Sequence, residues 1–117
     1  MTIEITREIA KKVVETVDKG LVRGLGHAEP GRMCVEAAVC YAMGLPHGDD
    51  PICVSGALRS FKIRLNDAYW STTKARAKGM RRLAVAQLGS RDALDDGLFV
   101  SGLVKLAHKW ADAAAAA

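Results

Sequence analysis

Aromatic residues, long apolar runs and paired cysteines are all scarce in this sequence of 117 residues. Only 5% of the chain is aromatic although 50% is hydrophobic, so we expect a core of aliphatic side chains on closely packed helices. No run approaches the roughly 18 consecutive apolar residues that cross a bilayer, and we predict no membrane association. The start of the sequence also lacks the basic and apolar regions of a signal peptide.

The three cysteines do not form a disulfide framework, because their number is odd and their spacing is irregular. Free thiols persist in reducing compartments. The sequence therefore predicts a cytoplasmic protein with reduced cysteines.

The spacing of apolar residues predicts an all-α protein. No stretch alternates apolar and polar residues as a half-buried strand would. One expected helix has an apolar stripe with members at steps of four, namely Ile5, Ile9, Val13, Val17 and Leu21. A chain of 117 residues is long enough to form one hydrophobic core. We predict a single helical domain over 1–112, an orthogonal bundle of about five helices around a buried central helix at about 32–43.

Caps and helix breakers predict where these helices begin and end. Thr2 or Thr6 caps the first helix, and Thr72 or Thr73 caps the fourth. Asp50 followed by Pro51 opens the third. Gly89 follows the fourth. The expected helices cover 5–21, about 32–43, 51–65, from 72 or 73 to 88, and from 95 or 96 onward. The five alanines at 113–117 are expected to be either a tail without ordered structure or residues added to the natural protein.

The central helix is apolar nearly all round, because Glu36 is the only charged residue between Met33 and Pro46. Such a helix is normally buried. Glu36 is either a first-turn acid paired with an arginine such as Arg32, or a buried carboxylate with a raised pKa that acts as a general base. We expect a paired Glu36, because an unpaired buried charge is costly.

Positive charge is concentrated between residues 59 and 82. This segment has eight basic residues and one acid, a net charge of +7 against +4 for the whole chain. Such asymmetry favours an anionic partner, either nucleic acid or an acidic protein surface, although a solvated basic face is the simpler alternative. The predicted binding residues are Arg59, Lys62, Tyr69, Trp70, Lys74, Lys78, Arg81 and Arg82.

A cysteine-dependent enzyme is the main alternative. Cys34 lies near the start of the central helix, where backbone N–H groups lower a thiol pKa. His47 follows as the base, and Asp49 or Asp50 would orient it. If the protein is an enzyme, its catalytic residues are Cys34, His47, Asp49 and Glu36. A thiol packed in the core is the simpler interpretation.

The residues around Cys34 are similar to the nucleophile region of transglutaminase-like thiol enzymes. The resemblance covers about 16 residues and consists of the pattern Gly31-x-x-Cys34-x-x-x-Ala38 followed by Gly44-Leu45-Pro46. It implies a nucleophilic Cys34. In that family the histidine and aspartate lie on β-strands further along the chain, whereas we predict no strands here.

Four residues have side chains suited to a zinc site, namely Cys34, Cys40, His47 and Cys53. Structural zinc sites usually pair ligands two to four residues apart. Cys34 and Cys40 instead lie about 120° apart around the expected helix. We therefore predict no metal and no cofactor.

The last helix has more apolar surface over 98–110 than one stripe requires. Such a helix either fills a groove in its own fold or binds a partner helix. Our main prediction is a small, non-enzymatic binding or regulatory module for an anionic partner. A homo-oligomeric structural protein assembled through 98–110, with a homodimer as its simplest form, is a further alternative.

Overall fold

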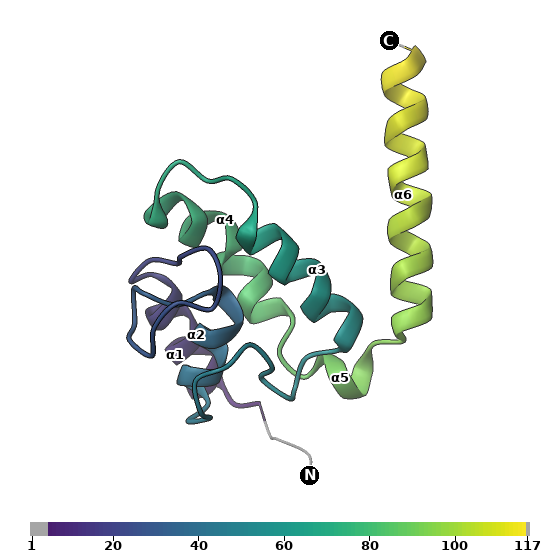
Figure 1. Cartoon of the computed structure of the whole chain (residues 1–117). Helices are drawn as coiled ribbons and strands as arrows, with labels where there is room; N and C mark the ends of the chain where they lie inside the picture. Colours follow the sequence, from purple (N-terminus) through teal and green to yellow (C-terminus); the bar gives the residue numbers. More distant parts are fainter. Residues whose placement is uncertain (1–4, 117) are drawn as a thin grey trace.

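The computed structural model describes residues 5–116, which form six helices and no strand (Figure 1). The all-α prediction is therefore confirmed for the described residues. The helices are α1 (Arg7–Val17), α2 (Val35–Ala42), α3 (Gly56–Asp67), α4 (Thr73–Ala86), α5 (Ser90–Ala93) and α6 (Asp96–Ala116).

The core lies where α1, α2 and α4 meet. Its side chains are mostly small and aliphatic, as the composition predicts. Every residue of α2 except Tyr41 is buried, which places this helix at the centre of the fold. α3 packs across α2 and touches α4, so three helices surround α2.

The central helix begins later than predicted, at Val35. Met33 forms an isolated antiparallel bridge with Gly26, and the backbone is still extended at Cys34. The Cys34 Sγ accepts a hydrogen bond from the N–H of Ala37 at 3.4 Å and so caps the helix. Gly26 has a φ of 72°, and a Cβ there would collide with the backbone beside the bridge.

The third helix also begins later than predicted, because Asp50 does not cap it. The Asp50 Oδ1 accepts the N–H of Ile52 at 3.2 Å, and Ile52 takes a left-handed φ of 42°. This turn interrupts the predicted helix in its first turn. α3 instead begins at Gly56, where the Ser55 Oγ accepts the N–H of Leu58 at 3.2 Å.

The caps of the first and fourth helices agree with prediction. Thr6 caps α1, and Thr72 caps α4 by accepting the N–H of Ala75 at 2.9 Å. Gly89 has a left-handed φ of 79° and separates α4 from the short α5, which the sequence did not predict. The predicted alternative cap Thr2 lies outside the described residues.

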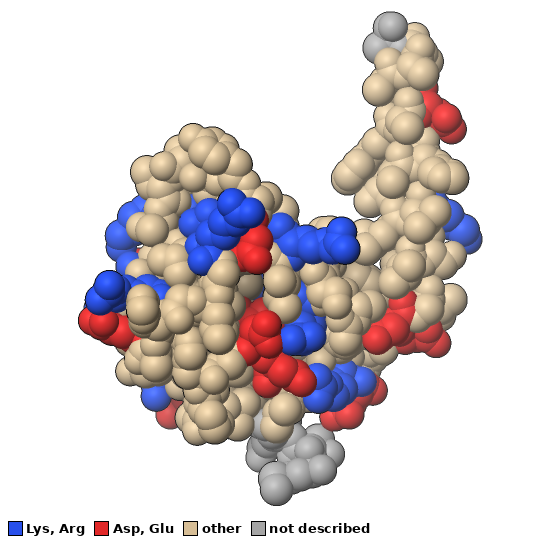
Figure 2. Space-filling model, viewed as in Figure 1, with Lys and Arg blue, Asp and Glu red and all other residues tan. Residues whose placement is uncertain are grey.

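α6 projects from the rest of the fold and contributes no buried residue (Figures 1 and 2). It is attached near its start, where the Asp96 Oδ2 accepts the N–H of Ala57 at 3.3 Å. The rings of Phe99 and Phe61 also pack edge to face, with their centroids 6.4 Å apart. The projection raises the radius of gyration to 15.0 Å. A compact chain of this length would have about 13.4 Å.

The helix continues through Ala116. Four of the five terminal alanines are therefore helical, and the expectation of an unordered tail is wrong for 113–116. Among residues 5–116 no helix is both long and apolar enough to traverse a bilayer.

Candidate functional site

A buried ion pair joins α2 to α3. The Nζ of Lys62 on α3 is 3.4 Å from the Oε1 of Glu36, and both side chains are 0% exposed. The Nε2 of Gln87 donates to the same oxygen at 2.6 Å. Burial raises the pKa of Glu36 although Lys62 opposes the change, and burial lowers the pKa of Lys62 to about 8.

This pair corrects two expectations. Lys62 does not belong to the basic surface, because it lies wholly in the interior. Glu36 is paired, as expected, but its partner is not Arg32, which instead lies 3.5 Å from Glu29 on the surface. The carboxylate needs a cation where it is buried, and only a residue on the inner face of α3 meets that need.

Two oxygen atoms of this cluster accept no hydrogen bond from residues 5–116. They are the Oε2 of Glu36 and the Oε1 of Gln87. Their loss of solvent contact is a cost to folding that the hydrogen bonds of the cluster must offset.

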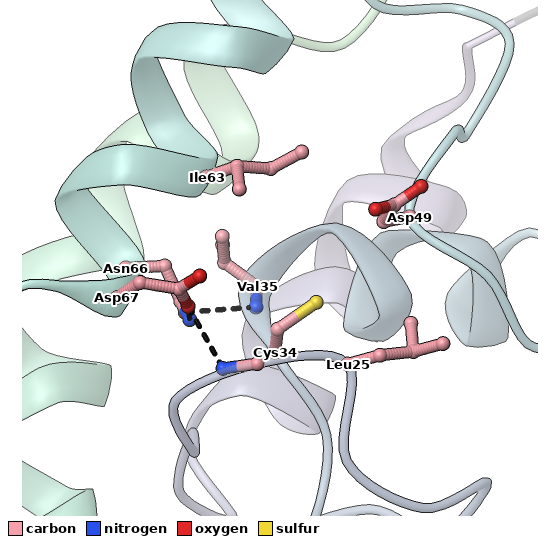
Figure 3. Close-up of a pocket in the computed structure, with 8 residues that line it drawn as sticks. Leu25, Cys34, Val35, Asp49, Ile63, Asn66 and Asp67 are labelled. Atoms are coloured by element: carbon pink, nitrogen blue, oxygen red, sulfur yellow. Dashed lines mark hydrogen bonds between the residues drawn. The ribbon is translucent and has the colours of Figure 1, made fainter.

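Cys34 borders a small cavity of about 50 Å³ (Figure 3). Asp49 and Asn66 also line it, together with Asp67, whose Oδ1 accepts the N–H of Gly24 at 2.8 Å. Burial raises the pKa of the Cys34 thiol more than the N–H of Ala37 lowers it. The thiol is therefore the protonated, weakly nucleophilic form near neutral pH.

The other residues of the predicted catalytic set are not gathered at Cys34. His47 is exposed and lines a different cavity, with Met33 and Tyr41 among its neighbours. Glu36 is committed to Lys62 and Gln87. The structure thus places only Asp49 beside Cys34.

The four possible zinc ligands Cys34, Cys40, His47 and Cys53 do not converge either. Among residues 5–116 no three His, Cys, Asp or Glu side chains are grouped closely enough to hold a metal ion. The Sγ of Cys53 contacts the Sδ of Met43 at 3.5 Å, and burial raises the pKa of Cys40 to about 12.

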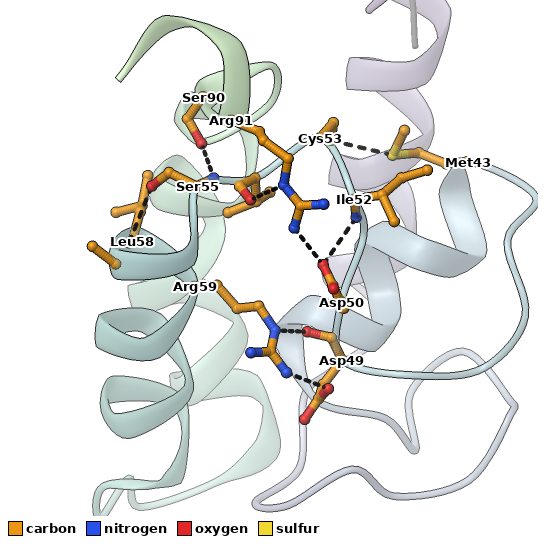
Figure 4. A network of polar contacts seen from close by, with 12 residues as sticks. Met43, Asp49, Asp50, Ile52, Cys53, Ser55, Leu58, Arg59, Ser90 and Arg91 are labelled. Atoms are coloured by element: carbon orange, nitrogen blue, oxygen red, sulfur yellow. Dashed lines mark hydrogen bonds and ion pairs between the residues drawn. The ribbon is translucent and has the colours of Figure 1, made fainter. Parts of the chain in front are cut away.

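Two arginines fasten the loop between α2 and α3 (Figure 4). The guanidinium of Arg59 lies 2.7 Å from Asp49, and that of Arg91 lies 2.7 Å from Asp50. Arg59 is therefore neutralised by a carboxylate of its own chain. An anionic partner that binds Arg59 would have to compete with Asp49 for the guanidinium group.

The two aromatic residues of the predicted surface differ in their exposure to solvent. Tyr69 is 92% exposed. The ring of Trp70 instead packs against the core and Gly79, and its Nε1 donates to the carbonyl of Leu65 at 3.0 Å. Trp70 is thus largely a structural residue.

The remaining cations of the predicted surface lie along α4. Lys74 donates to the carbonyl of Asp18 at 2.9 Å, and Arg81 lies 3.1 Å from the carboxylate of Asp18. Lys78 and Arg82 are exposed and form no ion pair with residues 5–116. We call these four residues the α4 cation row.

An open groove of about 360 Å³ runs beside this row, between α1 and α4. Val14 of α1 lines it, together with Val85 and Ala86 of α4. Arg81 and Arg82 complete the lining. The α1–α4 groove therefore combines apolar side chains with two guanidinium groups.

Sequence reasoning missed the buried polar residues that support these sites. Arg76 is buried and donates to the carbonyls of Asn66, Leu21 and Ala68, at 2.7, 3.4 and 3.3 Å. Asn66 accepts the N–H of Val35 at 3.0 Å. The sequence carries no signal for this burial, because Lys62 and Asn66 share one helix face and a polar face ordinarily points to solvent.

Comparisons of this chain with models of known protein families, with curated proteins and with solved structures find no match.

Proposed function

We propose that the protein is a non-enzymatic binding module that holds an acidic, partly apolar segment of another protein in the α1–α4 groove. The lining of the groove carries the proposal, because valine side chains stand there beside two guanidinium groups. The proposal keeps the predicted acidic partner and narrows its location from residues 59–82 to one face of α4.

The positive charge on that face comes from residues that share one side of a helix. Lys74, Lys78, Arg81 and Arg82 are spaced by four, three and one residues, which places them along one side. Lys78 and Arg82 have no carboxylate partner within 5–116 and are available to an incoming acid. Arg81 is held by Asp18, so a bound carboxylate would share it.

The apolar part of the lining favours an acidic protein over nucleic acid. Contacts to phosphates use positive charge and hydrogen-bond donors, and they gain nothing from Val14 and Val85. An amphipathic acidic helix would use both parts, with apolar side chains in the groove and carboxylates on the α4 cation row.

All three cysteines are free and buried. This supports, as part of the proposal, the expectation of a cytoplasmic setting, where thiols stay reduced.

Fluorescence anisotropy with a labelled synthetic peptide tests the proposal. The peptide is an amphipathic helix with leucines on one face and glutamates on the other. We expect Arg82→Glu to weaken its binding at least about tenfold, or about 1.4 kcal/mol. Arg64→Glu is the matched control, since it makes the same charge change at an exposed position of α3 outside the groove.

Two further probes separate the alternatives. A peptide of equal charge with serines in place of the leucines should bind more weakly, because it leaves the valines of the groove uncovered. A duplex DNA of similar length should bind weakly and lose that binding as salt increases. The proposal is wrong if the DNA binds more tightly than the peptide, or if Arg64→Glu and Arg82→Glu act equally.

A further inference from the structure

We infer that Asp18 is an internal competitor of the α1–α4 groove, because its carboxylate occupies Arg81 and so lowers the affinity of the groove for an acidic partner. The inference rests on the proposed function, since it concerns the same groove and the same α4 cation row. It adds to that function a contact within the chain that keeps the binding of the partner weak and reversible.

Asp18 contacts two members of the α4 cation row through two different groups. Its Oδ1 lies 3.1 Å from the Nε of Arg81, and its backbone carbonyl accepts a hydrogen bond from the Nζ of Lys74 at 2.9 Å. The side chains of Asp18 and Arg81 are each about half exposed. Lys78 and Arg82 form no ion pair with residues 5–116. The chain thus supplies one carboxylate of its own to a row of cations that can bind carboxylates.

The structure of α1 does not require an acid at position 18. Asp18 is the C-cap of this helix, where the partial negative charge of the helix end disfavours a carboxylate, and the last turn of α1 contains no basic residue. The backbone of Asp18 is in the ordinary helical region, with a φ of −64°, so it needs no special side chain. The charge of Asp18 is therefore compensated by α4 and not by its own helix.

Asp18 lies at the end of the groove where a carboxylate of the partner would bind. It follows Val14 by four residues, so the two side chains share one side of α1. Val14 lines the groove together with Arg81. A carboxylate that binds Arg81 comes close to Asp18, and two like charges beside one guanidinium repel each other. Because an exposed ion pair contributes little net stability, a partner can displace Asp18 without unfolding the chain.

Fluorescence anisotropy with the same leucine–glutamate peptide tests the competition. Asp18→Asn removes the charge but keeps the backbone carbonyl that Lys74 contacts, and we expect the peptide to bind about threefold more tightly. Glu15→Gln is the matched control, because it removes the same charge from α1 at a position that lines a different hollow. We expect this control to change the affinity much less. Thermal unfolding should show both variants folded, since neither side chain is buried.

A double-mutant cycle tests whether Arg81 is the group for which Asp18 and the peptide compete. Arg81→Gln removes the shared guanidinium. In that background Asp18→Asn should strengthen peptide binding clearly less than it does in the unaltered protein. An undiminished gain would show that Asp18 acts only by general repulsion of an acidic peptide, and it would overturn the inference.

Two further results would also overturn the inference. Asp18→Asn and Glu15→Gln could strengthen binding equally, or Asp18→Asn could weaken binding, which would show that Asp18 holds Arg81 in place for the partner. Both results leave the proposed function intact if Arg82→Glu still weakens binding more than Arg64→Glu does. A peptide that binds neither the unaltered protein nor Asp18→Asn would overturn the proposed function as well.

Discussion

The Nζ of Lys62 lies 3.4 Å from the Oε1 of Glu36, and neither side chain reaches solvent. The pair joins α3 to α2, and Gln87 brings α4 to the same carboxylate at 2.6 Å. Three helices thus meet at one charged atom in the interior. A buried pair contributes little net stability when intact, but it is costly to break.

Replacement of one partner should therefore destabilise the fold strongly. Lys62→Met leaves Glu36 buried without a cation, and we expect the free energy of unfolding to fall by about 3–5 kcal/mol. Urea unfolding followed by circular dichroism measures the change. The double variant Lys62→Met/Glu36→Gln should recover much of the loss, because it removes the orphaned charge. A double variant less stable than Lys62→Met would contradict this account.

The same pair predicts how stability depends on pH. Burial lowers the pKa of Lys62 from 10.5 to about 8 in the folded state. Between these values the unfolded chain holds more protons than the folded chain, so stability should increase with pH, by up to about 1.4 kcal/mol per pH unit. Urea unfolding from pH 7.5 to pH 10.5 measures the slope.

At acidic pH the dependence of stability on pH has the opposite sign. Burial raises the pKa of Glu36 above its ordinary 4.5, so stability should fall as the pH rises from 4.5 through the folded-state pKa of Glu36. The double variant lacks both titrating groups and serves as the control on both sides. An identical pH profile in the double variant would show that other groups set the dependence.

A glycine of α4 should resist substitution because an aromatic ring lies against it. A Cβ at Gly79 would collide with the indole of Trp70, so Gly79→Ala should lower stability by about 1–3 kcal/mol. Gly102→Ala is the matched control, since nothing lies within 4 Å of a Cβ there. We expect it to be neutral or slightly stabilising, because alanine favours a helix. Thermal unfolding compares the two, and equal effects would disprove the contact.

Cys34 should behave as a core thiol. Burial raises its pKa, so iodoacetamide near pH 7 should modify it only after unfolding. Mass spectrometry of native and urea-treated protein measures the difference. The tryptic peptide 33–59 contains all three cysteines, so its fragment ions are needed to assign the label to Cys34. Rapid alkylation in the native state would revive the thiol-enzyme alternative.

Much of the helical framework could be predicted because it depends on local signals. The apolar sequence around Glu36 predicts a buried central helix, and α2 is buried. Thr6 and Thr72 are caps because a hydroxyl satisfies an N–H within one turn. These effects act over a few residues and can be read without knowledge of the tertiary structure.

Local signals could not predict which side of α3 faces the core. The apolar stripe of Leu58, Phe61 and Leu65 predicts that Lys62 faces solvent. Phe61 is instead partly exposed and Lys62 is buried. The carboxylate of Glu36, 26 residues earlier in the chain, determines which side of α3 faces inward. The ion pairs of the candidate site could not be predicted either, because the partners of Arg59 and Arg81 are aspartates outside their own helices.

The attachment of α6 by its first turns separates two folding units. Residues 5–93 contain every buried side chain of the described chain, so their cooperative unfolding should not require α6. Most helices in proteins are stabilised by tertiary packing, which α6 lacks beyond its first turns, and Gly97 and Gly102 weaken it further. Backbone amides of 96–116 should therefore exchange with deuterium far sooner than those of α2, and become protected only when a second surface closes over them.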